Sequence, residues 1–133
     1  MGIFIRNPLQ RLFVVITIIT MAGCTGYISK TDLLHRIESG NAPPIIDART
    51  SWEYEEGHIP GAINIPFYSV IFCCCEIPSS EGEAVVVYCE HGPRAGITRS
   101  IMRVCYFGSV VYLEGHMESW REEGFPIEKS PEN

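Results

Sequence analysis

Basic residues are scarce in this sequence. The chain of 133 residues has 10 lysines and arginines against 16 aspartates and glutamates, which gives a formal net charge of −6. Nucleic acids attract proteins mainly through clustered lysine and arginine. The charge balance therefore argues against a nucleic-acid partner. The length leaves room for one domain and excludes a two-domain organisation.

Cysteine spacing of the kind that binds zinc or staples a secreted miniprotein is also missing. The six cysteines are unevenly spread, and no pair of them has the flanking ligands of a zinc site. They are Cys24, Cys73, Cys74, Cys75, Cys89 and Cys105. The sequence therefore implies no metal.

The sequence contains no apolar run of ordinary transmembrane length. The N-terminal run, Leu12 to Thr20, is shorter than the ~20 residues that a spanning helix needs. Arg6 and Arg11 precede or flank this run, and Ala22 and Gly23 stand directly before a cysteine. This order is typical of an export signal, and the small residues before the cysteine resemble a bacterial lipobox.

The lipobox interpretation predicts a lipoprotein-type signal peptide over residues 1–23 and lipidation of Cys24. Its alternative is an uncleaved membrane anchor. Both place the domain outside the cytoplasm, on the extracytoplasmic or periplasmic face of the cell envelope and tethered to a membrane. Residues 24–133 then carry 8 basic and 16 acidic side chains, a net charge of −8, and end in a short disordered tail from Glu128 onward.

Helical and extended patterns alternate along this domain. Ser29 to Ser39 has the apolar spacing of an amphipathic helix, and short strands are expected at Ile45–Ala48, Ala62–Ile65 and Val110–Leu113. This alternation is typical of an α/β domain with a mostly parallel sheet and helices on both faces.

The segment from Val85 to Arg99 indicates where the chemistry lies. Three valines and a tyrosine predict a buried strand, and a loop with Gly92 and Pro93 leads into a helical pattern. Cys89 falls at this strand-to-helix crossing, where backbone N–H groups and a helix N-terminus favour an anion. We expect the pKa of its thiol to fall below the ordinary ~8.5 and its nucleophilicity to rise. Arg94 is placed to hold a second anion or to brace the loop.

Four motifs in order resemble the rhodanese family over about Tyr27 to Phe125. The active loop of that family, Cys-x-x-Gly-x-Arg followed by a small residue, corresponds to Cys89-Glu90-His91-Gly92-Pro93-Arg94-Ala95. The other motifs are Asp47-Ala48-Arg49, Glu53-Tyr54 with Gly57-His58-Ile59-Pro60-Gly61-Ala62, and Glu114-Gly115 through Trp120. The sequence departs from the family at His116, which stands where a second glycine is usual. If that position has a positive φ, histidine is tolerated there at some cost.

The resemblance implies a rhodanese-like fold with about five strands and a sulfurtransferase activity without a dissociable cofactor. Cys89 would take sulfane sulfur from a donor such as thiosulfate, carry it as a persulfide and pass it to cyanide or a thiol. Glu90, His91, Gly92 and Pro93 would form the substrate-binding loop. Glu90 adds a carboxylate that should repel an anionic donor, so that Glu90→Gln would improve the use of thiosulfate.

Two other functions remain open at this stage. A phosphatase or arsenate reductase also uses a cysteine loop closed by arginine, although its loop is one residue longer than the four residues between Cys89 and Arg94. A persulfide carrier or sensor without turnover would use the same cysteine.

Three residues outside the active loop are expected at the same edge of the sheet. Asp47 and Arg49 should lie at the ligand-binding edge of the sheet and brace its loops through ion pairs with Glu53 or Glu55. His116 should reach the same edge as a proton donor or anion contact, or as a plain loop residue.

The remaining cysteines are expected to be structural. Phe67 to Ile77, which contains Cys73, Cys74 and Cys75, has no polar face and predicts a tightly packed crossover. The alternative is that these cysteines pair with one another or with Cys89. Cys105 recurs at helical spacing with apolar neighbours and is predicted to be a core residue.

Overall fold

A computed structural model describes residues 26–73, 77, 82–105 and 108–130 of the chain. The predicted signal segment, the predicted lipidation site Cys24 and two of the clustered cysteines, Cys74 and Cys75, lie outside these residues.

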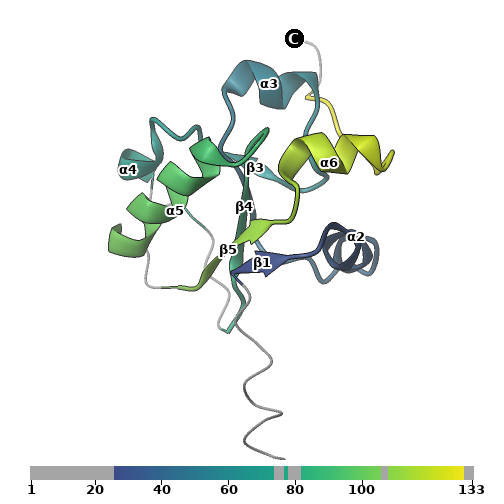
Figure 1. The fold of residues 1–133 in the computed structure, drawn as a ribbon, viewed down its shortest axis with the longest axis horizontal. Helices are drawn as coiled ribbons and strands as arrows, with labels where there is room; N and C mark the ends of the chain where they lie inside the picture. The colour runs from purple at the N-terminus through teal and green to yellow at the C-terminus, as the bar shows by residue number, and fades with distance from the viewer. Residues whose placement is uncertain (1–25, 74–76, 78–81, 106–107, 131–133) are drawn as a thin grey trace, which may run out of the picture.

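Five parallel strands form the centre of the domain (Figure 1). They are β1 (Tyr27–Ile28), β2 (Ile45–Asp47), β3 (Ile63–Asn64), β4 (Val85–Tyr88) and β5 (Val110–Leu113). Their order across the sheet is β1-β5-β4-β2-β3, and every pairing is parallel. The predicted parallel sheet with helices is thereby confirmed, and β4 occupies its centre.

Helices cover both faces of this sheet (Figure 1). They are α2 (Lys30–Glu38), α3 (Ser51–Glu56), α4 (Val70–Cys73), α5 (Pro93–Cys105) and α6 (His116–Glu122). Alternate residues of β4 divide the core: Val85 and Val87 pack with α4 and α5, whereas Val86 and Tyr88 pack with α2 and α6. All four residues are buried because β4 has neighbours on both faces, as a central parallel strand requires.

The sequence patterns locate most elements to within a residue or two and miss three of them, β1, α3 and α4. Ser29 caps α2 by accepting a hydrogen bond from the Asp32 backbone N–H at 3.1 Å. The patterns do not predict β1, because two residues are too few to show a period. They also miss α3, although Thr50 and Glu53 form the capping box that marks a helix start.

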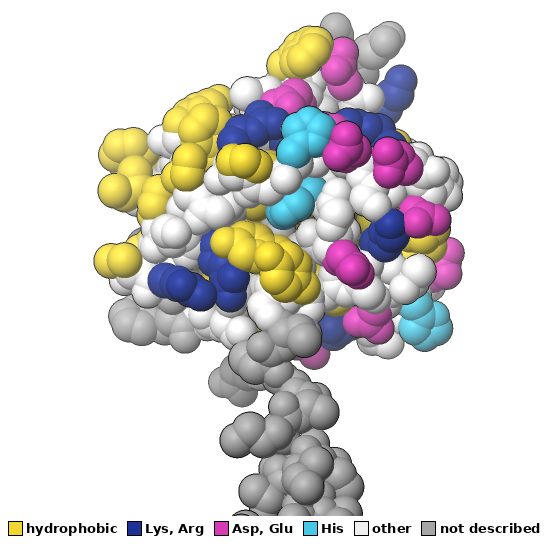
Figure 2. Space-filling view, viewed as in Figure 1, with side chains coloured by type: hydrophobic (Ala, Val, Ile, Leu, Met, Phe, Trp, Pro, Cys, Tyr) yellow, Lys and Arg dark blue, Asp and Glu magenta, His cyan; other side chains and the backbone are white. Residues whose placement is uncertain are grey.

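The apolar segment after β3 is only partly packed, which corrects the predicted tight crossover. Val70 is fully buried, but Phe72 is 84% exposed, and Val104 on the neighbouring α5 is 85% exposed. Figure 2 shows hydrophobic side chains gathered on the edge of the molecule formed by α4 and α5. The exposed members there are Tyr68, Ile71, Phe72, Ile97 and Val104.

Two cysteines near this edge have different states. Cys73 is a free thiol of intermediate burial. Cys105, predicted to lie in the core, packs against the core cluster while only partly buried, and it is disulfide-bonded.

The chain end is held more firmly at Glu128 than the predicted disordered tail implies. Glu128 and His58 form an antiparallel bridge, with both backbone hydrogen bonds 2.9 Å long. The Glu128 carboxylate also accepts from the Gly61 N–H at 3.1 Å. The tail therefore does not begin at Glu128.

No helix among residues that the structure describes is long and apolar enough to cross a membrane.

Candidate active site

Cys89 directly follows the central strand β4 and is buried, with 1% of its surface exposed. The loop behind it turns at Gly92, whose φ of 120° is a conformation that favours glycine. This turn directs the Gly92 N–H at Cys89 Sγ, with 3.0 Å between nitrogen and sulfur. Helix α5 begins at the next residue, so its positive end lies beside the same sulfur. The loop thus supplies a hydrogen-bond donor and a helix dipole to a cysteine sulfur.

Arg94 braces this loop through Glu53 of α3. Its two terminal nitrogens donate to the two carboxylate oxygens of Glu53 at 2.5 and 2.8 Å, a bidentate pair. The hydrogen bond from Arg94, opposed by burial and aided by Thr50, lowers the pKa of Glu53 to about 2. Of the two roles predicted for Arg94, the structure shows the bracing contact with Glu53.

Asp47 and Arg49 form a buried pair at the carboxyl ends of the strands. Arg49 donates to both Asp47 oxygens, with a shortest contact of 2.7 Å, and to the Gly57 carbonyl at 2.7 Å. The Tyr88 hydroxyl donates to Asp47 at 2.7 Å. Burial alone would lower the pKa of Arg49, but its hydrogen bonds to Asp47 raise it, while burial and the Asp47 charge raise the pKa of Tyr88 well above its ordinary value. The sequence correctly places this pair, but its partners are not Glu53 or Glu55.

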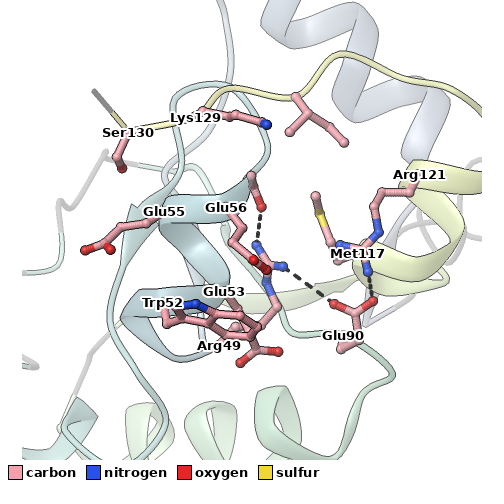
Figure 3. A pocket seen from close by; sticks show the side chains of 12 residues that line it. Arg49, Trp52, Glu53, Glu55, Glu56, Glu90, Met117, Arg121, Lys129 and Ser130 are labelled. Atoms are coloured by element: carbon pink, nitrogen blue, oxygen red, sulfur yellow. Dashed lines mark hydrogen bonds and ion pairs between the residues drawn. The ribbon is translucent and has the colours of Figure 1, made fainter. Parts of the chain in front are cut away.

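Glu90 lies between two arginines (Figure 3). Its carboxylate is 3.5 Å from Arg49 and forms an ion pair with Arg121 of α6. The side chain of Glu90 is 18% exposed. Its negative charge is therefore balanced locally, which corrects the prediction of an unopposed carboxylate beside the nucleophile.

A cleft of about 1280 Å³ opens beside the active loop, between α3, α6 and the chain end near Lys129 (Figure 3). Glu90 and Met117 form part of its wall, and Cys89 does not. The complete lining is Arg49, Trp52, Glu53, Glu55, Glu56, Gly57, Glu90, Met117, Arg121, Ile127, Lys129 and Ser130. The cleft thus reaches the loop from the Glu90 side.

The first turn of helix α6 donates backbone hydrogen bonds to the first residues of the active loop. The backbone N–H of Met117 donates to the Cys89 carbonyl at 3.0 Å, and that of Glu118 donates to the Glu90 carbonyl at 3.3 Å. The Glu118 carboxylate is also 3.1 Å from Nδ1 of His91, in an exposed pair. These contacts join segments far apart in the sequence, and the sequence carried no local signal for them.

His116 opens α6 with a left-handed backbone, φ 53°, and is the one such non-glycine residue in the described ranges. The cost predicted for histidine at this position therefore applies. Its ring reaches the active loop, where Nδ1 lies 3.4 Å from the Cys89 backbone nitrogen. Burial, together with the nearby His91, lowers the pKa of His116. Among the described residues, no cluster of histidine, cysteine and carboxylate side chains could hold a metal ion.

The fold and loop define an α/β domain with a buried cysteine in a strand-to-helix loop. The Rhodanese-like domain model matches residues 29–123, so the chain belongs to the rhodanese-like domain family. The predicted family is thereby confirmed.

Named relatives agree with this assignment. A sulfurtransferase of Allochromatium vinosum is 29% identical over 75% of this chain and 92% of its own length. A putative sulfur carrier protein of Bacillus subtilis, YrkF, is 28% identical over 70% of this chain and 49% of its own. The chain spans about half the length of two further relatives, 53% and 44%.

Solved structures share the fold. A rhodanese-related protein from Thermoplasma volcanium has a TM-score of 0.64 and 27% identity, over 78% of this chain and 98% of its own.

Proposed function

We propose that this protein is a sulfurtransferase that carries sulfane sulfur as a persulfide on Cys89. The observation that carries the proposal is the hydrogen bond of 3.0 Å from the Gly92 N–H to Cys89 Sγ beneath the active loop. A donor in that position stabilises an anionic sulfur, and both the thiolate and the persulfide are anions. The names of the Allochromatium vinosum and Bacillus subtilis relatives support the same chemistry.

The reaction has two balanced halves. In the first, the Cys89 thiolate attacks the outer sulfur of thiosulfate, the sulfur–sulfur bond of the donor breaks, and sulfite leaves with the electron pair. In the second, cyanide or a thiolate attacks the outer sulfur of the Cys89 persulfide, and the Cys89 thiolate leaves. The Gly92 N–H and the start of α5 stabilise the charge on Sγ in both halves.

The engagement of Arg94 disfavours the phosphatase alternative. Phosphoryl transfer needs a cation on the oxygens of the transferred group. Both terminal nitrogens of Arg94 instead donate to Glu53. A persulfide carrier without turnover is the second candidate, supported by the sulfur carrier among the relatives.

The test is the intact mass of the domain before and after thiosulfate. We expect the parent to gain one sulfur atom that cyanide removes, and Cys89→Ser to gain none. Cys73→Ser is the matched control, because Cys73 is also a free thiol and lies on α4, outside the active loop. A parent that gains no sulfur, or a Cys89→Ser variant that still gains it, would refute the proposal. Steady-state production of thiocyanate then separates an enzyme from a carrier.

We further propose that the domain is exported and tethered to the extracytoplasmic face of the cell envelope through a lipid on Cys24. The support is the order of Arg6 and Arg11, the apolar run and the small residues before Cys24. Cys24→Ser should abolish incorporation of a labelled fatty acid and leave an unprocessed precursor. Equal label in parent and variant would contradict lipidation at Cys24.

A further inference from the structure

His116 has a backbone conformation that is unfavourable for histidine and that glycine would adopt freely. A left-handed non-glycine residue is strained, and such strained residues cluster at functional sites. The preceding residue, Gly115, is also left-handed, with φ 70°, so two consecutive residues turn the chain into α6. This turn brings the imidazole of His116 onto the active loop.

The ring lies along the two residues that hold the nucleophilic sulfur. Its Nδ1 accepts a long hydrogen bond, 3.4 Å, from the backbone N–H of Cys89. Its Nε2 lies 3.1 Å from the place that a Cβ on Gly92 would occupy. The Gly92 N–H is the group that donates to Cys89 Sγ at 3.0 Å. Nδ1 of the imidazole therefore contacts the backbone amide of Cys89. Nε2 lies beside Gly92, at the turn whose N–H donates to the Cys89 sulfur.

The contact with Cys89 determines which nitrogen of the ring carries the proton. A neutral imidazole has one N–H and one acceptor nitrogen, and here Nδ1 is the acceptor. The proton is therefore on Nε2, which becomes a hydrogen-bond donor at the Gly92 end of the loop. Burial, and then the neighbouring His91, lower the pKa of His116, which favours this neutral form at pH 7.

Carboxylates already engage the arginines around the loop. Arg94 is paired with Glu53. Arg49 is paired with Asp47 and Glu90, and Arg121 is paired with Glu90. His91 is paired with Glu118. Among the described residues at the loop, His116 is thus the basic side chain that forms no ion pair with a carboxylate.

We propose that His116 Nε2–H binds the anionic group of the sulfur donor and stabilises it as it departs. This inference rests on the proposed function. When the Cys89 thiolate attacks the outer sulfur of thiosulfate, the departing sulfite takes the electron pair and its charge concentrates on the leaving group. The Nε2–H donates a hydrogen bond to an oxygen of that group, and the proton stays on nitrogen.

The test measures the two half-reactions separately in parent and variants, by intact mass on a rapid time course. Loading is the gain of sulfur from thiosulfate, and discharge is its loss to cyanide. His116→Gly accepts φ 53° without strain, so it keeps the fold while removing the imidazole. Loading by this variant should slow by about tenfold or more, which is the ordinary effect of losing a hydrogen bond to a charged group. Discharge should stay within about twofold, since the leaving group there is Cys89 itself.

Two further variants distinguish the contact made by Nε2 of the ring from the contact made by Nδ1. The amide nitrogen of His116→Gln replaces Nε2 and should restore part of the loading rate. The shorter amide of His116→Asn can replace only Nδ1 at the Cys89 N–H, and it should load as slowly as the glycine variant. His35→Gln, at an exposed histidine of α2, controls for loss of a histidine.

The outcomes separate this inference from the function on which it rests. A parent that gains no sulfur refutes both. A parent that loads normally, with all His116 variants loading at the parent rate, refutes only the role of His116. Equal slowing of loading and discharge would also refute it, because that result indicates a loop that has lost its shape. Rescue by His116→Asn but not by His116→Gln would show that the ring acts through the Cys89 amide instead.

Discussion

The ion pairs of Glu90 change what its charge does at the site. From the sequence, a carboxylate directly after the nucleophile should repel an anionic donor. In the structure, Arg49 and Arg121 both neutralise this carboxylate. The benefit expected from Glu90→Gln should therefore be much smaller than the sequence suggests, and the repulsion should appear only when a partner is removed.

Removing Arg121 should leave the negative charge of Glu90 only partly neutralised. We expect Arg121→Gln to lower kcat/KM for thiosulfate by roughly twofold to fivefold at low ionic strength, an effect of up to ~1 kcal/mol for an exposed pair, and the loss should shrink as salt is added. The double variant Arg121→Gln with Glu90→Gln should return close to the parent.

Arg103→Gln supplies the control for net charge, since Arg103 is an exposed arginine of α5. If Arg103→Gln lowers kcat/KM as much as Arg121→Gln does, the effect belongs to the overall field and not to Glu90. Equal kinetics in the parent and Arg121→Gln would show that Arg49 alone neutralises the carboxylate.

At the level of elements, the pair of Glu53 and Arg94 joins α3 to the start of α5. Neither helix contacts the other through a large apolar surface, because none of the α3 residues is buried. The same Glu53 carboxylate closes the capping box of α3 with Thr50. One side chain therefore fixes both where α3 begins and how the active loop is held.

This pair predicts a specific dependence of stability on pH. The pKa of Glu53 is lowered from 4.5 to about 2, so the folded state binds its proton less readily than the unfolded state. The stabilisation is therefore fully present above pH about 4.5 and is lost as the pH falls through about 2. Glu53→Gln should lower the free energy of unfolding at pH 7 by about 1–2 kcal/mol, and the difference from the parent should shrink below pH 4.5.

Denaturant unfolding of parent and variant from neutral pH down to the acid limit of the fold measures this difference. Glu55→Gln, on the exposed face of the same helix, is the control and should change stability little at any pH. A Glu53→Gln deficit that stays constant down to the lowest pH would mean that the lost contact is not ionic.

For the whole molecule, the sequence predicts what depends on local pattern and composition. The run Val85–Tyr88 identifies the central strand because its residues are apolar on both faces, and the residues after it identify the active loop. The left-handed cost at His116 is also predictable, since a glycine is usual there. The resemblance to the family supplies the expected number of strands, about five, and the sheet has five.

The partners of the charged residues could not be predicted in this way. Arg49, Arg94 and Arg121 are long side chains whose contacts depend on how α3 and α6 pack over the loop, and no short-range pattern encodes that packing. The apolar segment at Val70–Cys73 shows the same limit, since composition alone could not separate its buried Val70 from its exposed Phe72. Periodicity needs several turns to distinguish two faces, and α4 has only four residues.

The pairing of β1 with β5 has a consequence for how the protein is made. The first strand of the sheet pairs with the last, and the N–H groups of Met117 and Glu118 secure the loop that contains Cys89. On the ribosome, Cys89 is therefore synthesised before both the strand β5 that completes the sheet and the helix α6 whose N–H groups hold its loop. The proposed site around Cys89 is thus incomplete in a nascent chain until α6 has emerged and docked.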